Sequence, residues 1–215
     1  MRHLAIIADG NRRWARAHGL DAELGHTHGL AAFERCAEWA IKNNVPYLTL
    51  FALSTENLGR EKAEVEHIFD LARSYFVTRR EWYVENGIKV LFLGRKDRMP
   101  QDVVGIMFDM EAATRRGENL TLCICCDYGG RDEIARAAAH GALSETAITE
   151  ALTAFAPEPD MILRTGGRHR LSNFMLWQAA YAEILFSDTL FPDLDFAVLD
   201  DAARWYDKQV RNFGK

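Results

Sequence analysis

The chain has 215 residues, of which 48% are hydrophobic and 27% charged, and this composition predicts one globular domain over residues 1–215. The formal net charge of -5 argues against a nucleic-acid partner bound through a broadly basic face. No apolar segment approaches the roughly 20 residues of a membrane-spanning helix, and the first residues lack a signal-peptide pattern. We therefore expect a cytoplasmic protein.

Strand-like and helix-like patterns alternate along the chain. Apolar runs bounded by turn residues predict strands at 4–8, 47–53, 88–93, 120–126, 160–163 and 184–186. Apolar residues at helical spacing predict helices at 11–19, 27–43, 62–86, 100–116, 131–141, 174–181 and 196–212, and a short one after Ser144. This order predicts an α/β fold with a central, mostly parallel sheet flanked by helices on both faces.

Three of the four cysteines, Cys123, Cys125 and Cys126, lie in the apolar run at 120–126. Their spacing is not that of a zinc site or of a disulfide framework. We interpret them as reduced core residues of a cytosolic protein, and a zinc site is the less favoured alternative.

The apolar run at 4–8 ends at a carboxylate, and the chain then turns through glycine into a cationic helix. Asp9 is expected at the carboxyl end of its strand, where open α/β sheets bind ligands. Gly10 and Asn11 favour a tight turn, and Arg12 and Arg13 add positive charge beside it. The pattern predicts a site for a diphosphate and a divalent cation. For this segment alone, an aspartate that merely caps a turn is the alternative.

Two further predicted strands end in polar residues that suit an anion. The strand at 47–53 is followed by Ser54, Thr55, Glu56, Asn57 and Arg60, and the strand at 160–163 by Arg164, a glycine pair, Arg168, Arg170 and Ser172. Arginines bind phosphate oxygens bidentately, and glycines let backbone amides approach an anion. The second loop therefore predicts a second anion site, against the alternative of a solvated turn with ordinary surface arginines.

The sequence resembles the cis-prenyltransferases, of which undecaprenyl diphosphate synthase is the best-known bacterial member. The resemblance runs in order from about residue 4 to 192 and therefore covers nearly the whole chain. It is carried by Asp9-Gly10-Asn11 with Arg13-Trp14, Gly25-His26, Ser54-Thr55-Glu56-Asn57, Tyr128-Gly129-Gly130-Arg131, Arg164-Thr165-Gly166-Gly167, Arg170-Leu171-Ser172-Asn173 and the segment from Trp177 to Glu183. A set of this many ordered motifs is far more specific than one glycine signature.

The resemblance implies a prenyl chain-elongating enzyme, which adds isopentenyl diphosphate to an allylic diphosphate such as farnesyl diphosphate with a cis double bond at each step. It implies Mg²⁺ as cofactor, with Asp9 and Glu183 as its carboxylates, and Asn57 as a catalytic residue that orients the reacting groups. It implies substrate-binding roles for Gly10, Asn11, Arg12, Arg13, Trp14, His26, Ser54, Thr55, Glu56, Arg60, Arg164, Arg170, Leu171 and Ser172. No side chain is an obvious base for the final proton, and a diphosphate oxygen is the alternative acceptor.

A growing prenyl chain is a hydrocarbon, and each buried CH₂ contributes about 0.8 kcal/mol, so the product requires an apolar tunnel. The apolar stripe of the helix at 62–86 could line it, and large side chains at the tunnel floor would shorten the product. The alternative is that Phe69, Tyr75 and Phe76 are plain core residues. The lipid product is expected to associate with a membrane.

Several positions depart from the family pattern. Ala22 stands where the family has a phosphate-binding arginine, Arg12 replaces a glycine, Leu58 a tryptophan, Glu61 a proline and Arg168 a glutamate. Either Arg12 or Arg168 could restore the charge that Ala22 lacks. A divergent short-chain or specialised synthase is therefore an alternative.

Two alternatives belong to other classes, an inactive partner subunit and a phosphohydrolase. Retention of Asp9, Asn57, Glu183 and both arginines at the Arg164-Thr165-Gly166-Gly167 motif argues against the first. The resemblance also implies a homodimer that pairs near Glu183 and the C-terminal helix, and the tail from Arg211 is expected to fold toward the partner's phosphates.

Overall fold

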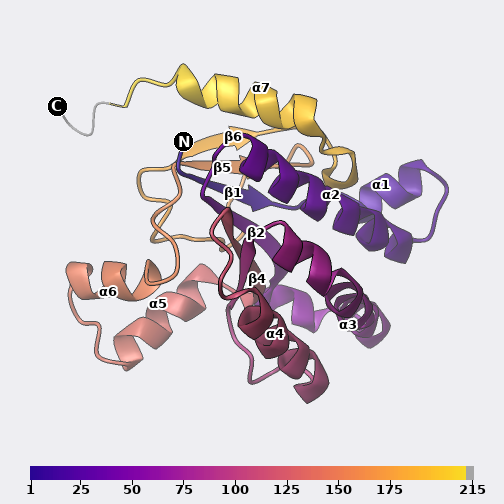
Figure 1. The fold of residues 1–215 in the computed structure, drawn as a ribbon, viewed down its shortest axis with the longest axis horizontal. Coiled ribbons are helices and arrows are strands. Elements are labelled where there is room, and N and C mark those ends of the chain that lie inside the picture. The colour runs from indigo at the N-terminus through magenta and orange to yellow at the C-terminus, as the bar shows by residue number, and fades with distance from the viewer. Residues whose placement is uncertain (212–215) are drawn as a thin grey trace.

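The computed structural model describes residues 1–211 and contains one six-stranded sheet (Figure 1). The strands are β1 (His3–Ile7), β2 (Tyr47–Ser54), β3 (Ile88–Leu93), β4 (Leu120–Tyr128), β5 (Met161–Arg164) and β6 (Glu183–Phe186). They lie in the order β3-β4-β2-β1-β5-β6, and every neighbouring pair is parallel. The predicted α/β fold is confirmed, and the sheet is entirely rather than mostly parallel.

Seven α-helices and two short 3₁₀ segments accompany these strands within residues 1–211. The α-helices are α1 (Asn11–Ala17), α2 (Ala22–Lys42), α3 (Lys62–Glu85), α4 (Gln101–Thr114), α5 (Gly130–Ala139), α6 (Glu145–Leu152) and α7 (Phe196–Asp207), and the 3₁₀ segments are η1 (Thr55–Gly59) and η2 (Phe191–Asp193). In the described part of the chain, none of these helices has the length and apolar character needed to cross a bilayer.

The sheet separates two hydrophobic clusters, because successive side chains of a strand point to opposite faces. Leu4 and Ile6 of β1 belong to the larger cluster, which α2, α3, α4 and α7 cover. Ala5 and Ile7 belong to the smaller one, which the segment containing Phe174 covers. Helices α2, α3, α4 and α7 therefore cover one face of the sheet.

The predicted helix at 174–181 is wrong, since this segment forms turns. Met175 has a φ of 42°, and Ser172 and Asn173 just before it have φ values of 51° and 63°. Phe174 is fully buried and stacks on Phe51 of β2, with ring centroids 4.7 Å apart. The turns allow this packing, so tertiary contacts override the helical spacing.

The structure confirms one smaller prediction and corrects the bounds of two predicted helices. Cys123 and Cys125 are buried in β4, as their alternation predicted, and burial raises the pKa of the Cys123 thiol to about 12. Helix α2 begins at Ala22, five residues earlier than predicted from the position of Thr27. Helix α7 ends at Asp207, and the part of the predicted helix and tail from residue 212 onward lies outside the described residues.

Candidate active site

The polar strand ends meet because the strands that carry them are neighbours. Ile7 at the end of β1 pairs with Phe51 of β2 on one side and with Arg164 of β5 on the other. The residues that follow these positions therefore lie along one edge of the sheet. The parallel direction of the strands alone predicts that the three loops after β1, β2 and β5 lie on the same side of the sheet. The order of the strands adds that the Asp9 turn lies between the loop after β2 and the loop after β5.

The turn after β1 depends on Gly10. Its φ of 119° lies in a region that side chains rarely adopt, and a Cβ there would lie 3.0 Å from the Cα of Leu190. Helix α2 in turn packs very close to this turn, because a Cβ on Gly25 would lie 2.1 Å from the carbonyl oxygen of Asn11. This close approach brings His26 to the turn.

The carboxylate of Asp9 lies between two guanidinium groups. Arg13 Nη2 donates to Oδ1 at 3.1 Å, and Arg164 Nη2 donates to Oδ2 at 2.8 Å. Arg164 is only 3% exposed, and its Nη1 also donates to Ser172 Oγ at 2.8 Å. A single buried arginine therefore joins the Asp9 turn to the second predicted anion loop.

A cationic pocket of about 350 Å³ opens beside Asp9. Its charged lining consists of Asp9 and four arginines, Arg12, Arg13, Arg16 and Arg60. Glu64 of α3 orients two of them, at 2.9 Å from Arg60 and 3.6 Å from Arg12. Positive charge therefore outweighs negative charge around this pocket, as an anion site requires.

A second polar pocket of about 260 Å³ lies between the ends of β2 and β5. Arg164, Arg170 and Ser172 line it on one side, and Ser54 and Asn57 on the other. Asn57 Oδ1 accepts the Ser54 N–H at 3.1 Å, while the Asn57 N–H donates to Ser54 Oγ at 3.2 Å. This reciprocal cap fixes the Asn57 side chain and leaves its Nδ2 donors available to a ligand.

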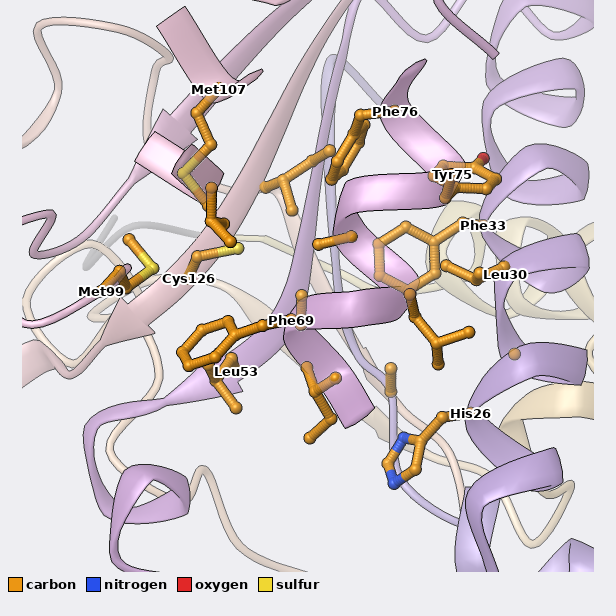
Figure 2. A pocket seen from close by; sticks show the side chains of 18 of the residues that line it. His26, Leu30, Phe33, Leu53, Phe69, Tyr75, Phe76, Met99, Met107 and Cys126 are labelled. Carbon is orange, nitrogen blue, oxygen red and sulfur yellow. The ribbon is translucent and has the colours of Figure 1, made fainter. Parts of the chain in front are cut away.

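An apolar cavity of about 110 Å³ lies beneath these pockets, between the sheet and helices α2, α3 and α4 (Figure 2). Leucine, phenylalanine, methionine and other apolar side chains make up most of its lining. Its lining shares three residues with both polar pockets, Ala8, Asn11 and His26, which we call the junction. Two cationic pockets and one apolar cavity therefore meet at the same place.

The junction contains buried polar atoms without a hydrogen-bond partner among the described residues. Asn11 Oδ1 and His26 Nε2 are both of this kind. Burial, followed by the nearby positive charge of Arg60, lowers the pKa of His26 to about 4. The imidazole is therefore neutral at pH 7 and, in its Nε2–H tautomer, can donate to a bound anion.

Five of the residues that the resemblance implies do not line the three pockets within the described chain: Trp14, Thr55, Glu56, Leu171 and Glu183. Trp14 is buried, and its Nε1 donates to Asp193 at 2.6 Å, so it fastens α1 to η2. Glu56 Oε1 accepts from Asn173 Nδ2 at 2.9 Å and so ties η1 to the loop after β5. These contacts join the elements that surround the pockets, and the two side chains do not line the pockets themselves.

Glu183 does not share a site with Asp9 within one chain. It pairs with Met161, which pairs with Leu4 at the opposite end of β1. Leu4 and Ile7 are three positions apart in β1, or roughly 10 Å at the usual rise, and Asp9 lies beyond Ile7. The expected pairing of these two carboxylates on one metal ion therefore requires Glu183 to come from a second copy of the chain.

Sequence reasoning missed Arg16 and Glu64. Arg16 follows Arg12 by four residues, and Glu64 follows Arg60 by four, so helical spacing was the signal that could have found both. The structure also separates the two arginines that could replace the charge missing at Ala22. Arg12 lines the first cationic pocket, whereas Arg168 lines neither polar pocket.

Comparisons with known proteins show the family to which the chain belongs. Residues 7–214 match the family described as "Putative undecaprenyl diphosphate synthase". An isoprenyl transferase of Aquifex pyrophilus is 42% identical over 99% of this chain and 95% of its own length. An isoprenyl transferase of Neisseria meningitidis is 41% identical over 100% of this chain and 89% of its own length.

Two solved structures are also similar throughout. Lavandulyl diphosphate synthase from Lavandula x intermedia, solved with dimethylallyl diphosphate, has a TM-score of 0.94 at 30% identity and covers 100% of this chain and 98% of its own. A probable undecaprenyl diphosphate synthase from Campylobacter jejuni has a TM-score of 0.87 at 33% identity and covers 100% of this chain and 99% of its own.

Fold, site and relatives together define an enzyme that transfers prenyl groups. The chain belongs to the undecaprenyl diphosphate synthase family, whose members are isoprenyl transferases.

Proposed function

We propose that the protein catalyses the Mg²⁺-dependent condensation of isopentenyl diphosphate with an allylic diphosphate and forms a cis double bond at each step. One observation carries this proposal: two cationic pockets and an apolar cavity meet at Ala8, Asn11 and His26. The reaction needs two diphosphates side by side and a dry space for the hydrocarbon that grows between them. Each of these needs corresponds to one of the three hollows.

The allylic diphosphate is assigned to the pocket with four arginines. Asp9 and Asn11 of this pocket adjoin the second site, and Asn11 and His26 also line the apolar cavity, which would receive the allylic tail. The solved complex of lavandulyl diphosphate synthase with dimethylallyl diphosphate supports an allylic diphosphate as a substrate of this fold.

Isopentenyl diphosphate is assigned to the second pocket. Arg164 and Arg170 supply charge there, and the Ser172 hydroxyl supplies a further hydrogen-bonding group. Asn57, fixed by its cap with Ser54, is placed to orient the reacting groups. Because Arg164 also contacts Asp9, both bound diphosphates would be held by one connected network.

The donor set near Asp9 fits Mg²⁺. Magnesium accepts one or two carboxylates together with phosphate oxygens and water. The Asp9 side chain is 27% exposed at the first pocket, so an ion can reach it once one of its arginine partners releases an oxygen. When bound, Mg²⁺ would neutralise charge on the leaving diphosphate.

The remaining chemistry depends on charge and on the exclusion of water. Arginines beside the first diphosphate stabilise the negative charge that develops as the allylic C–O bond breaks. The apolar lining of the cavity keeps water from the cationic carbon. In the ligand-free site the lowered pKa keeps His26 neutral at pH 7, and its Nε2–H would donate to a phosphate oxygen. A diphosphate oxygen is the proposed acceptor of the final proton.

The quaternary structure belongs to the same proposal. Strand β6 is an edge strand whose four residues are all half-buried, and the adjacent Tyr181 is 74% exposed. We infer that this edge pairs with a second copy, which would also be the source of a second carboxylate from Glu183. Light scattering during size-exclusion chromatography should give twice the monomer mass, and a monomeric mass would contradict the dimer.

Incubation of the purified protein with Mg²⁺, dimethylallyl or farnesyl diphosphate and labelled isopentenyl diphosphate tests the reaction. A longer labelled prenyl diphosphate is expected, with the cis geometry of each new double bond visible by NMR and with activity lost in EDTA. Release of phosphate without a longer lipid would indicate a phosphohydrolase. No reaction with any primer would indicate an inactive partner subunit.

A further inference from the structure

The second polar pocket has two walls that come from different loops. Ser54 and Asn57, at the end of β2 and in η1, line one wall, and Arg170 and Ser172 of the loop after β5 line the other. Strand β1 lies between β2 and β5 in the sheet, so the two walls are not joined by pairing between their own strands. The width of the pocket therefore depends on contacts that the loops themselves make.

One hydrogen bond joins the two walls just outside the pocket. Asn173 follows Ser172 in the chain, and Glu56 precedes Asn57. Asn173 Nδ2 donates to Glu56 Oε1 at 2.9 Å. Neither of these two side chains lines the pocket. The hydrogen bond therefore connects the walls without filling the space that a ligand would occupy.

The start of helix α5 fixes the orientation of the Asn173 amide. The Gly130 N–H donates to the Asn173 backbone oxygen at 2.6 Å, and the Arg131 N–H donates to Asn173 Oδ1 at 2.9 Å. Because a backbone N–H can only donate, Oδ1 faces Arg131 and Nδ2 faces the carboxylate of Glu56. A Cβ on Gly129 would lie 2.7 Å from Asn173 Nδ2, so the glycine leaves the space that this amide needs.

The backbone at Asn173 suits the same role. Its φ of 63° lies in the left-handed region, which asparagine adopts more readily than most other residues. The next residue, Phe174, is fully buried and stacks on Phe51 of β2. The loop after β5 is therefore anchored to β2 directly after Asn173, and the side chain of Asn173 is held where it meets the segment after β2.

We propose that Asn173 is a positioning residue, whose hydrogen bond to Glu56 sets the spacing between the two walls of the pocket assigned to isopentenyl diphosphate. This inference rests on the proposed function and adds a role for two residues outside the pocket. Loss of the hydrogen bond lets Asn57 move relative to a diphosphate held by Arg170 and Ser172. The first pocket contains none of the four wall residues, so binding of the allylic diphosphate is unaffected.

The first test compares Glu56→Ala with Glu56→Gln. Both substitutions remove the same negative charge, but only glutamine keeps an oxygen that accepts from Asn173. Glu56 is exposed, so neither substitution removes core packing. Steady-state kinetics with Mg²⁺, farnesyl diphosphate and isopentenyl diphosphate give kcat and a separate KM for each substrate.

The proposal predicts different results for the two variants. Glu56→Ala should raise the KM for isopentenyl diphosphate by about fivefold to tenfold and lower kcat, because the walls are no longer joined. Glu56→Gln should change the same KM by at most about twofold, because the hydrogen bond remains. The KM for the allylic diphosphate should stay within about twofold of the original value in both variants.

A second test exchanges donor and acceptor. Asn173→Asp keeps an oxygen for the Arg131 N–H but places a carboxylate opposite Glu56, so the KM for isopentenyl diphosphate should rise at least as much as in Glu56→Ala. In the double variant Asn173→Asp with Glu56→Gln, the introduced glutamine donates to the introduced aspartate, and the total charge equals that of the unaltered protein. The KM should return to within about threefold of the original value.

The two tests separate positioning from a purely structural or electrostatic role. Removal of charge alone predicts a lower KM for isopentenyl diphosphate in Glu56→Ala, and that result would overturn the inference. Equal effects of Glu56→Ala and Glu56→Gln, an equal rise in the KM for the allylic diphosphate, or no recovery in the folded double variant would also overturn it.

Thermal unfolding shows which variants are folded. If Asn173→Asp does not fold, the comparison at Glu56 decides the question by itself. An absence of any elongated product from the unaltered protein would instead contradict the proposed function.

Discussion

Replacement of Asp9 by asparagine tests the electrostatic design of the first site. Asp9→Asn keeps the size of the side chain and removes the negative charge that lies between Arg13 and Arg164. Because this charge has two opposite effects in the proposed mechanism, the substitution should separate binding from turnover. The negative charge of Asp9 repels a diphosphate directly. The same charge attracts the Mg²⁺ on which departure of that diphosphate depends.

The size of both effects follows from Coulomb's law for an assumed separation of the two charges. At roughly 6 Å, one unit charge contributes about 0.7 kcal/mol in water and about 3 kcal/mol at an effective dielectric constant near 20. The Asp9 side chain is 27% exposed, so a value near 1 kcal/mol is appropriate, equivalent to about fivefold tighter binding of a metal-free diphosphate. Loss of the metal contribution should cost about 3 kcal/mol in the transition state, or about a hundredfold in kcat/KM.

Binding and rate are measured separately. Calorimetry with inorganic diphosphate in EDTA should show tighter binding to Asp9→Asn, and addition of Mg²⁺ should improve binding only to the unaltered protein. Steady-state kinetics should show the loss in kcat/KM. If Asp9→Asn retains full turnover with the same Mg²⁺ dependence, Asp9 is not a metal ligand and the reasoning fails.

Three further predictions concern the frame of the site. Arg164→Lys keeps the charge, but lysine cannot bridge the carboxylate of Asp9 and the hydroxyl of Ser172 as arginine does. Transition-state stabilisation, measured from kcat/KM, should therefore fall by about 2–3 kcal/mol. Unchanged steady-state kinetics would argue against the bridge. Gly25→Ala places a Cβ 2.1 Å from the Asn11 oxygen and should destabilise the protein to urea by about 1–3 kcal/mol, whereas exposed Gly105→Ala, with open space around it, should stabilise it by up to about 1 kcal/mol. Burial lowers the pKa of His3 to about 4 from 6.5, so between these pH values only the unfolded chain gains the proton. Stability should fall by up to about 3 kcal/mol as pH drops through this window, and His3→Gln should flatten that slope in denaturation curves.

The polar ends of three strands were predictable as one site because a parallel sheet places all carboxyl ends at the same edge. Asp9, Asn57 and Arg164 could therefore be grouped from the sequence alone. Glu183 illustrates the limit of this reasoning. The resemblance implies the role of Glu183, but Glu183 stands at the beginning of β6. The rule that groups Asp9, Asn57 and Arg164 at the carboxyl ends of the strands therefore places Glu183 at the opposite, amino-terminal ends.

Side-chain partners were much less predictable than strand ends. The resemblance implies that Trp14 lies beside a diphosphate, yet its indole is buried and donates to Asp193. The segment at 174–181 has helical spacing but forms turns, because Phe174 packs flat on Phe51. In both cases a contact between residues far apart in the sequence decides the outcome, and local pattern carries no information on it.

By itself, the sequence determined the alternation of strands and helices, and hence the parallel sheet, the edge where charge gathers and the kinds of residue gathered there. These properties follow from local hydrophobic periodicity and from turn residues. Only the tertiary structure decided that two cationic pockets and an apolar cavity meet at Ala8, Asn11 and His26. Cavities are spaces between elements, and their size and continuity depend on how closely helices pack, which the spacing of residues along one helix cannot specify.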